Sequence, residues 1–277
     1  MLARMKADLH THTRASDGTL APQELLARAA AQGVSLLAIT DHDTVAGLHG
    51  LDTSAYPDLR VIPGAEFSTR WARIGIHVLG LNLRLDSPQL RAGLAQQRAA
   101  RDERAVVIAR RLAQRGLHNV LEGARAMAGE AAIGRPHVAD YLVASGQVRD
   151  RETAFRRYLG PGKPGDVRQT WASLDEVISW IAAAGGQAVL AHPGKYRLSN
   201  LKLEELVRDF AAQGGHGLEV VCGRQEAALT RRLSKLAARH GLLASCGSDF
   251  HSAGPYRPDL GDIEPLPASS RPVWNLW

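Results

Sequence analysis

The sequence predicts an α/β fold, a distorted (β/α)7 barrel with an inserted helical domain. Short apolar strands alternate with helices, and a polar side chain able to bind or react lies at or near the end of each strand. This alternation is typical of a barrel whose site lies at the carboxyl ends of parallel strands. The alternation stops over residues 89–165, which have a helical pattern. We therefore expect a barrel from 1–88 and 166–277 and a helical insertion at 89–165.

Strands are expected first at residues 6–10, 35–40, 59–63 and 74–81. The helix at 22–32 begins at a proline, Pro22, and ends before Gly33, the usual asymmetry of helix ends. Because alternate residues of a strand point to the same side, His10 and His12 should project together.

The insertion is expected to contain a long helix from Pro88 to about residue 115 and shorter helices at 135–144 and 151–158. Ser173 and Glu176 then form a capping box, which predicts the start of another helix. The remaining strands are expected at 187–191, 217–221 and 242–246, with helices at 203–213 and 225–240 between them. The proline-rich tail from Pro255 should form an irregular strap over the barrel.

Composition predicts a cytoplasmic protein that binds no membrane and has no obligate protein partner. The chain has 277 residues, of which 45% are hydrophobic, and no apolar run approaches the ~20 residues of a membrane span. Arg4 and Lys6 are followed at once by polar residues, unlike a signal peptide. Cys222 and Cys246 lack CxxC spacing, which fits a reducing compartment.

Positive charge is concentrated in the insertion. Residues 89–165 hold 14 Lys and Arg against 7 Asp and Glu, whereas the whole chain has a net charge of +6. A basic surface favours an anionic partner such as a nucleotide or a nucleic acid. The alternative is that these arginines only solvate helix surfaces, since no basic run is long enough for a nucleic-acid arm.

Nine side chains have the donor types of metal ligands and lie at or near predicted strand ends. They are His10, His12, Asp17, His42, Glu66, His77, His192, Asp249 and His251; of these, His77 lies within the strand expected at 74–81 and Asp17 in the loop after the first strand. Nine donors exceed what one ion can use, so we expect two or three ions, with Glu66 bridging a pair. Nitrogen and carboxylate donors without thiolate favour Mn, Fe or Zn. Adjacent divalent ions are suited to phosphoester hydrolysis. Asp8 and Asp43 are expected to orient ligand histidines.

The motifs DLHTHTRASDGT, TDHDT, GAE, GIHVLG, GRPH, AHPGKY and GSDFH occur in this order. They resemble the PHP (polymerase and histidinol phosphatase) metal-dependent phosphoesterases over essentially the whole chain. YLGPGKPGDV followed by WASL is similar to the branch that removes the 3′-phosphate from 3′,5′-nucleoside bisphosphates, related to the 5′→3′ exoribonuclease RNase AM.

The resemblance implies hydrolysis by metal-activated water, for example of pAp (3′-phosphoadenosine 5′-phosphate) to AMP and phosphate. A 5′→3′ exoribonuclease acting on short 5′-phosphorylated RNA is the main alternative. A histidinol-phosphate phosphatase and a non-catalytic metal-binding module are further alternatives.

The resemblance also implies a trinuclear centre, with Mn²⁺ expected and Fe or Zn possible. The first ion would be held by His10, His12, Glu66 and Asp249, the second by Glu66, His77 and His192, and the third by Asp17, His42 and His251. Substrate contacts would come from Arg14, Ser16, Asp17, Arg135, His137, Lys163 and Arg168. His137 could instead complete a metal shell, and Asp166 departs from the pattern expected after GKPG.

Overall fold

The computed structural model describes residues 5–167, 171–255 and 257–277. The chain forms two compact units, a barrel unit (Met1–Leu94 with Ala172–Trp277) and a helical unit (Ala95–Trp171). The sequence placed the corresponding boundaries after residues 88 and 165. Within the described ranges, no helix is both long and apolar enough to cross a membrane.

The barrel unit contains a seven-stranded sheet whose strands are ordered as in the sequence. The strands are β1 (Ala7–Asp8), β2 (Leu36–Ile39), β3 (Arg60–Trp71), β4 (Ile74–Leu81), β5 (Gln187–Leu190), β6 (Gly217–Cys222) and β7 (Leu243–Gly247). The first and last strands meet, because the Leu9 N–H donates to the Cys246 carbonyl and the Asp249 N–H donates to the His10 carbonyl, each at 2.9 Å. The sheet is therefore a nearly closed barrel.

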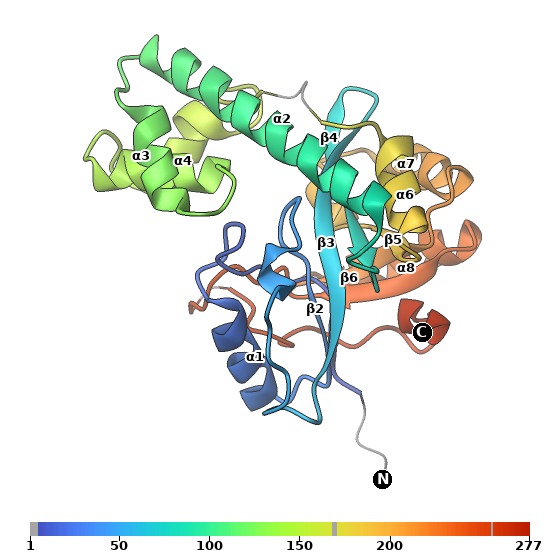
Figure 1. Cartoon of the computed structure of the whole chain (residues 1–277). Coiled ribbons are helices and arrows are strands. Elements are labelled where there is room, and N and C mark those ends of the chain that lie inside the picture. The colour runs from blue at the N-terminus through green and yellow to red at the C-terminus, as the bar shows by residue number, and fades with distance from the viewer. Residues whose placement is uncertain (1–4, 168–170, 256) are drawn as a thin grey trace. The chain divides into compact units, whose positions relative to one another are not determined.

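Our expectation of parallel strands throughout is wrong for β4, which is antiparallel to both β3 and β5. Only Ala72 and Arg73 connect β3 to β4, and two residues can join antiparallel strands but cannot cross over between parallel ones. β3 is also longer than expected, so Glu66 lies within the strand, opposite Leu79, and not beyond its end. Figure 1 shows the resulting long hairpin.

The α-helices that lie entirely within the described part of the barrel unit are α1 (Pro22–Ala31), α6 (Leu174–Ala183), α7 (Asn200–Ala212) and α8 (Ala227–Arg239). α6 lies against β5 and α8 against β6 (Figure 1), so their apolar faces cover the sheet. The predicted capping box of α6 is confirmed, with the Ser173 N–H donating to Glu176 Oε2 at 2.8 Å.

The tail contributes a 3₁₀ turn, η4 (Val273–Leu276), and pairs with the barrel where the Ala244 N–H donates to the Arg271 carbonyl at 2.8 Å.

The helical unit has its own hydrophobic core, which includes Leu112, Leu142 and Leu159. Its elements are α2 (Pro88–Ala113), which begins in the barrel unit, α3 (Val120–Ala128), α4 (Arg135–Ala144), α5 (Arg151–Ala154) and the π-helical turn η2 (Phe155–Leu159). α3 was not expected. It is nine residues long and begins at Val120. Its N-cap, Asn119, adopts a left-handed conformation and forms no side-chain cap, but Asn119 followed three residues later by Glu122, with Gly129 after the helix, was an available sequence signal.

Gly247→Ala should destabilise the barrel, because a methyl group at this position would overlap His10 across the seam between β1 and β7. We expect a loss of about 1–3 kcal/mol, the usual cost of overpacking, measured by chemical denaturation. Gly75→Ala in β4 is the matched control, since a methyl group there meets no described atom within 4 Å. Equal stability of both variants would contradict the close packing of the seam.

Candidate metal centre

The nine predicted ligands come from segments far apart in the sequence and meet in the barrel unit. His10 and His12 follow β1, His42 follows β2, and Asp249 follows β7. Each of the nine belongs to at least one group of side chains whose donor atoms lie within 4.8 Å of one another. The structure therefore brings the whole predicted set together.

One group surrounds Oε2 of Glu66, which is fully buried. His10 Nε2 and His12 Nε2 each lie 3.3 Å from this oxygen and also 3.3 Å from Asp249 Oδ1. Two nitrogens and two carboxylate oxygens thus face a common point, as four ligands of one ion would.

The other oxygen of Glu66 faces a second group. Oε1 lies 2.7 Å from His77 Nδ1 and 2.9 Å from His192 Nε2. His42 Nδ1 lies 2.9 Å from Oε2. Glu66 therefore has the placement of a bridging carboxylate, and His42 approaches it more closely than the family pattern implied.

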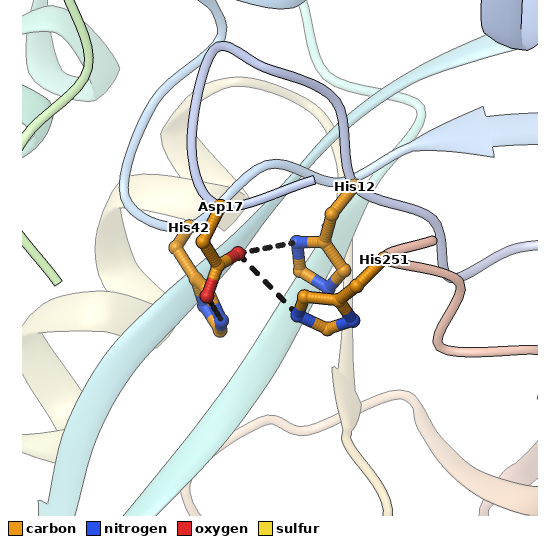
Figure 2. Close-up of side chains that lie close together, drawn as sticks. All are labelled: His12, Asp17, His42 and His251. Carbon is orange, nitrogen blue, oxygen red and sulfur yellow. Dashed lines mark ion pairs between the residues drawn. The ribbon is translucent and has the colours of Figure 1, made fainter. Parts of the chain in front are cut away.

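Asp17 is the centre of a third group, shown in Figure 2. Its carboxylate lies 3.3 Å from His251 Nε2, 3.8 Å from His42 Nε2 and 4.0 Å from His12 Nδ1. The four side chains point toward one another, so His12 presents one ring nitrogen to this group and the other to Glu66.

Protonation in the centre reflects burial and dense charge. Burial and the neighbouring His251 and His42 lower the pKa of His12 to about 3, so its ring is neutral at pH 7. Burial also lowers the pKa of His10, but the charges of Glu219, Glu66 and Asp249 outweigh burial and raise this pKa well above its usual value. The carboxylates therefore favour positive charge at the position where an ion would be held.

Two further observations show that these residues fit metal ions. Among the described residues, buried His10 Nε2, both ring nitrogens of His12 and Glu66 Oε2 have no hydrogen-bond partner. Buried polar atoms left without partners are costly and need an explanation. Two ligands each about 2.1 Å from an ion lie roughly 3.0–3.4 Å apart, close to the 3.3 Å separations around Glu66 Oε2.

Two of the candidate ligands have unusual backbone conformations. His192 after β5 has φ of 28° and Asp249 after β7 has φ of 54°, in the left-handed region that residues other than glycine rarely adopt. Such residues cost of order 1–3 kcal/mol and persist where the surrounding structure requires them. Here the conformation turns both side chains toward the centre.

Glu219 of β6 is a site residue that the sequence analysis missed. It is fully buried, its Oε1 lies 3.0 Å from His10 Nδ1, and its Oε2 accepts the His192 N–H at 2.5 Å. With Nδ1 donating to Glu219, His10 would present the lone pair of Nε2 to an ion that takes the place of the proton there. A carboxylate in the otherwise apolar strand GLEVVC was the available signal.

Other buried carboxylates hold the backbone around the centre. Asp41 accepts hydrogen bonds from the Thr13 amide and hydroxyl groups at 2.7 and 2.6 Å and from the Ser16 hydroxyl at 2.6 Å. Asp8 accepts the amides of Ser248 and Gly261, both at 2.8 Å, and Asp43 accepts the Ser68 amide at 2.7 Å. Their hydrogen bonds to the backbone fix the loops that carry the ligands.

Arg14 is exposed and donates to the Thr19 carbonyl at 2.7 Å.

Three of the predicted substrate contacts lie in the helical unit. Arg135 is the first residue of α4 and donates to the Leu159 carbonyl at 3.0 Å. The Gly134 N–H donates to Nδ1 of the buried His137 at 3.0 Å. Lys163 is exposed, and Arg168 lies outside the described residues.

The helical unit also contains two buried arginines, Arg101 and Arg104, that the sequence analysis did not single out. Their guanidinium carbons lie 5.3 and 5.2 Å from the centroid of the Trp171 ring, which is a cation–π arrangement.

A nearly closed seven-strand barrel with clustered histidines and carboxylates defines a metal-dependent hydrolase. Residues 8–144 match the PHP domain family. The chain belongs to this family of metal-dependent phosphoesterases.

Two relatives are similar to the chain over nearly its whole length. A 3′,5′-nucleoside bisphosphate phosphatase from Chromobacterium violaceum is 44% identical, covering 97% of this chain and 95% of that protein. The 5′-3′ exoribonuclease Rnm of Escherichia coli is 42% identical, covering 98% of this chain and 93% of that protein.

A solved structure described as an amidohydrolase from Chromobacterium violaceum, with bound sulfate and no metal, superposes with a TM-score of 0.90 at 43% identity. The match covers 98% of this chain and 95% of that one.

Glu219→Gln should weaken the binding of divalent ions. Both oxygens of Glu219 accept hydrogen bonds, whereas an amide has one accepting oxygen, so either His10 or the His192 amide loses its partner. We expect a 10–100-fold rise in the Kd for Mn²⁺, the typical effect of such outer partners, measured by calorimetry. Glu204→Gln, on the surface of α7, is the control. Unchanged affinity in Glu219→Gln would show that the ring of His10 needs no orientation.

Proposed function

We propose that the chain hydrolyses the 3′-phosphoester of nucleotides that carry a 5′-phosphate, with 3′,5′-nucleoside bisphosphates such as pAp as substrates. The observation that carries the proposal is the convergence of nine nitrogen and oxygen donors around Glu66 and Asp17. Its support comes from the 44% identity to a bisphosphate phosphatase along nearly the entire chain.

Two or three divalent ions would be held by the nine residues, with Mn²⁺ favoured and Fe or Zn as alternatives. Bound ions would lower the pKa of water toward 7 and polarise the phosphoryl oxygens. Cys222 also lies near His10 and Glu219, but burial, followed by the charge of Glu219, raises the pKa of its thiol well above the usual value. The thiol of Cys222 is therefore protonated when no ion is bound.

The chain's own residues have distinct tasks in this reaction. Glu66, Asp17 and Asp249 supply the negative charge that retains the ions, because the neighbouring imidazoles offset burial and keep the pKa of each carboxyl well below its usual value. Glu219 fixes the ring of His10, and Asp41 fixes the loop that carries Asp17. No side-chain nucleophile is needed.

The second phosphate would be bound by basic side chains of the helical unit. Arg135, His137 and Lys163, with Arg168, are the proposed contacts. Arg14 and Ser16, next to Asp17 in the barrel unit, are separate proposed substrate contacts. Arg135 stands at the N-terminus of a ten-residue helix, where unpaired amides also favour anions. A guanidinium group can bind phosphate through two parallel hydrogen bonds.

A 5′→3′ exoribonuclease activity is the second candidate, favoured by the 42% identity to such an enzyme. A 5′-phosphorylated oligoribonucleotide and pAp share a 5′-phosphate next to a 3′-phosphoester, so one centre could act on both. Histidinol phosphate carries a single phosphate and makes no use of the basic helical unit.

Purified protein with Mn²⁺ should release phosphate from pAp and leave AMP, and Glu66→Gln should abolish this activity because it removes the charge shared by two ligand groups. Phosphate release is measured by a colorimetric assay, with bound metal quantified in parallel. Glu205→Gln, at an exposed ion pair with Lys202, is the control. Full activity in Glu66→Gln would contradict the proposed centre.

Arg135→Ala should reduce the preference for a substrate with two phosphates. We expect the ratio of kcat/KM for pAp to that for 3′-AMP to fall about tenfold or more, the effect of losing a charge-assisted hydrogen bond. Arg110→Ala, at an exposed position of α2, is the control. An equal effect on both substrates would mean that Arg135 does not bind the 5′-phosphate.

A further inference from the structure

We propose that a cavity beside the metal centre binds the nucleotide that follows the scissile phosphate in a 5′-phosphorylated oligoribonucleotide. This inference rests on the proposed function and assigns the part of the substrate that distinguishes RNA from a bisphosphate. The cavity lies in the barrel unit and has a volume of about 370 Å³, within the range of roughly 300–1,000 Å³ typical of small-molecule sites.

The cavity adjoins the ions' proposed position directly. Two of the nine candidate ligands, Asp249 and His251, line its wall. A group bound in the cavity is therefore within reach of whatever is held at those side chains. Gly223 and Ser248 contribute to the same wall, where the Gly223 amide donates to the Gly247 carbonyl at 2.8 Å.

Three basic side chains, those of Lys195, Arg224 and Arg257, also line the cavity. Lys195 forms an ion pair with Asp249, and Arg224 pairs with Asp262 at 2.5 Å. Arg257 donates to the Ser252 hydroxyl at 2.7 Å and has no carboxylate partner among the described residues. The charge of Arg257 is therefore not offset by a described carboxylate. With Lys195 and Arg224 in the same cavity, its guanidinium group is suited to bind the phosphodiester of a polynucleotide.

The chemistry of the two substrates explains why such a cavity is needed. In both, water adds its oxygen to phosphorus, the bond from phosphorus to O3′ breaks, and O3′ takes up a proton. With pAp, the phosphorus leaves as inorganic phosphate. With RNA, the phosphoryl group stays on the following nucleotide as its new 5′-phosphate, so that nucleotide must fit beside the centre throughout.

Arg257 is accordingly placed to contact the next phosphodiester, which pAp lacks. The test compares kcat/KM for pApApA with kcat/KM for pAp in the presence of Mn²⁺. For Arg257→Ala we expect the ratio of the two to fall about tenfold, as for loss of one charge-assisted hydrogen bond. Arg257→Lys, which keeps the charge, should give an intermediate ratio. Arg208→Ala, whose side chain pairs with Asp209 on α7 and does not line the cavity, should leave the ratio unchanged.

An unchanged ratio in Arg257→Ala, or an equal loss on both substrates, would overturn the inference. So would a wild-type protein that hydrolyses pAp but leaves pApApA intact, although the proposed function would then stand. If the wild-type protein hydrolysed neither substrate, the proposed function itself would be wrong. Thermal melting of each variant confirms that it is folded.

Discussion

Glu66 is a carboxylate inside the barrel unit with no exposure to solvent, and a buried charge without compensation costs several kcal/mol. Imidazole rings of His10, His12, His42 and His77 surround it, with a ring nitrogen of each 2.7 to 3.3 Å from one of its oxygens. The side chain is therefore tolerated only while these rings stay in place. That requirement explains the long β3–β4 hairpin, which carries Glu66 and His77 on adjacent strands.

A second set of buried carboxylates keeps the first in position. Glu219 accepts hydrogen bonds from the His10 ring and the His192 amide. Asp41 fixes the loop at Thr13, and Asp8 fixes the loop at Ser248, through hydrogen bonds from the backbone amides. Each of these hydrogen bonds takes the place of a hydrogen bond to water that the carboxylate lost on burial. The centre is thus fixed by the chain before any substrate arrives, as preorganised electrostatic catalysis requires.

Much of this arrangement could be predicted from the sequence. Ligands such as His42, His192 and Asp249 could be found because each lies beside an apolar run that predicts a strand, and the resemblance of the motifs added the assignment of ligands to individual ions. The direction of β4 was missed because the third strand was expected to end at residue 63, which left ten residues before the fourth strand. In the structure β3 continues to Trp71, so only two residues connect it to β4. Glu219 was missed because a single carboxylate in an apolar strand has no spacing pattern. Its role depends on neighbours contributed by β1 and β5, which only the folded chain reveals.

The seam between β1 and β7 has a consequence for the biogenesis of the enzyme. It unites His10 and His12 with Asp249 and His251, which the ribosome adds more than 200 residues later. Domains tend to fold in order of synthesis, so the helical unit, with its separate core, can form while the last strand is still missing. Loading with metal must then be a late event in maturation, and a truncated nascent chain would be inert.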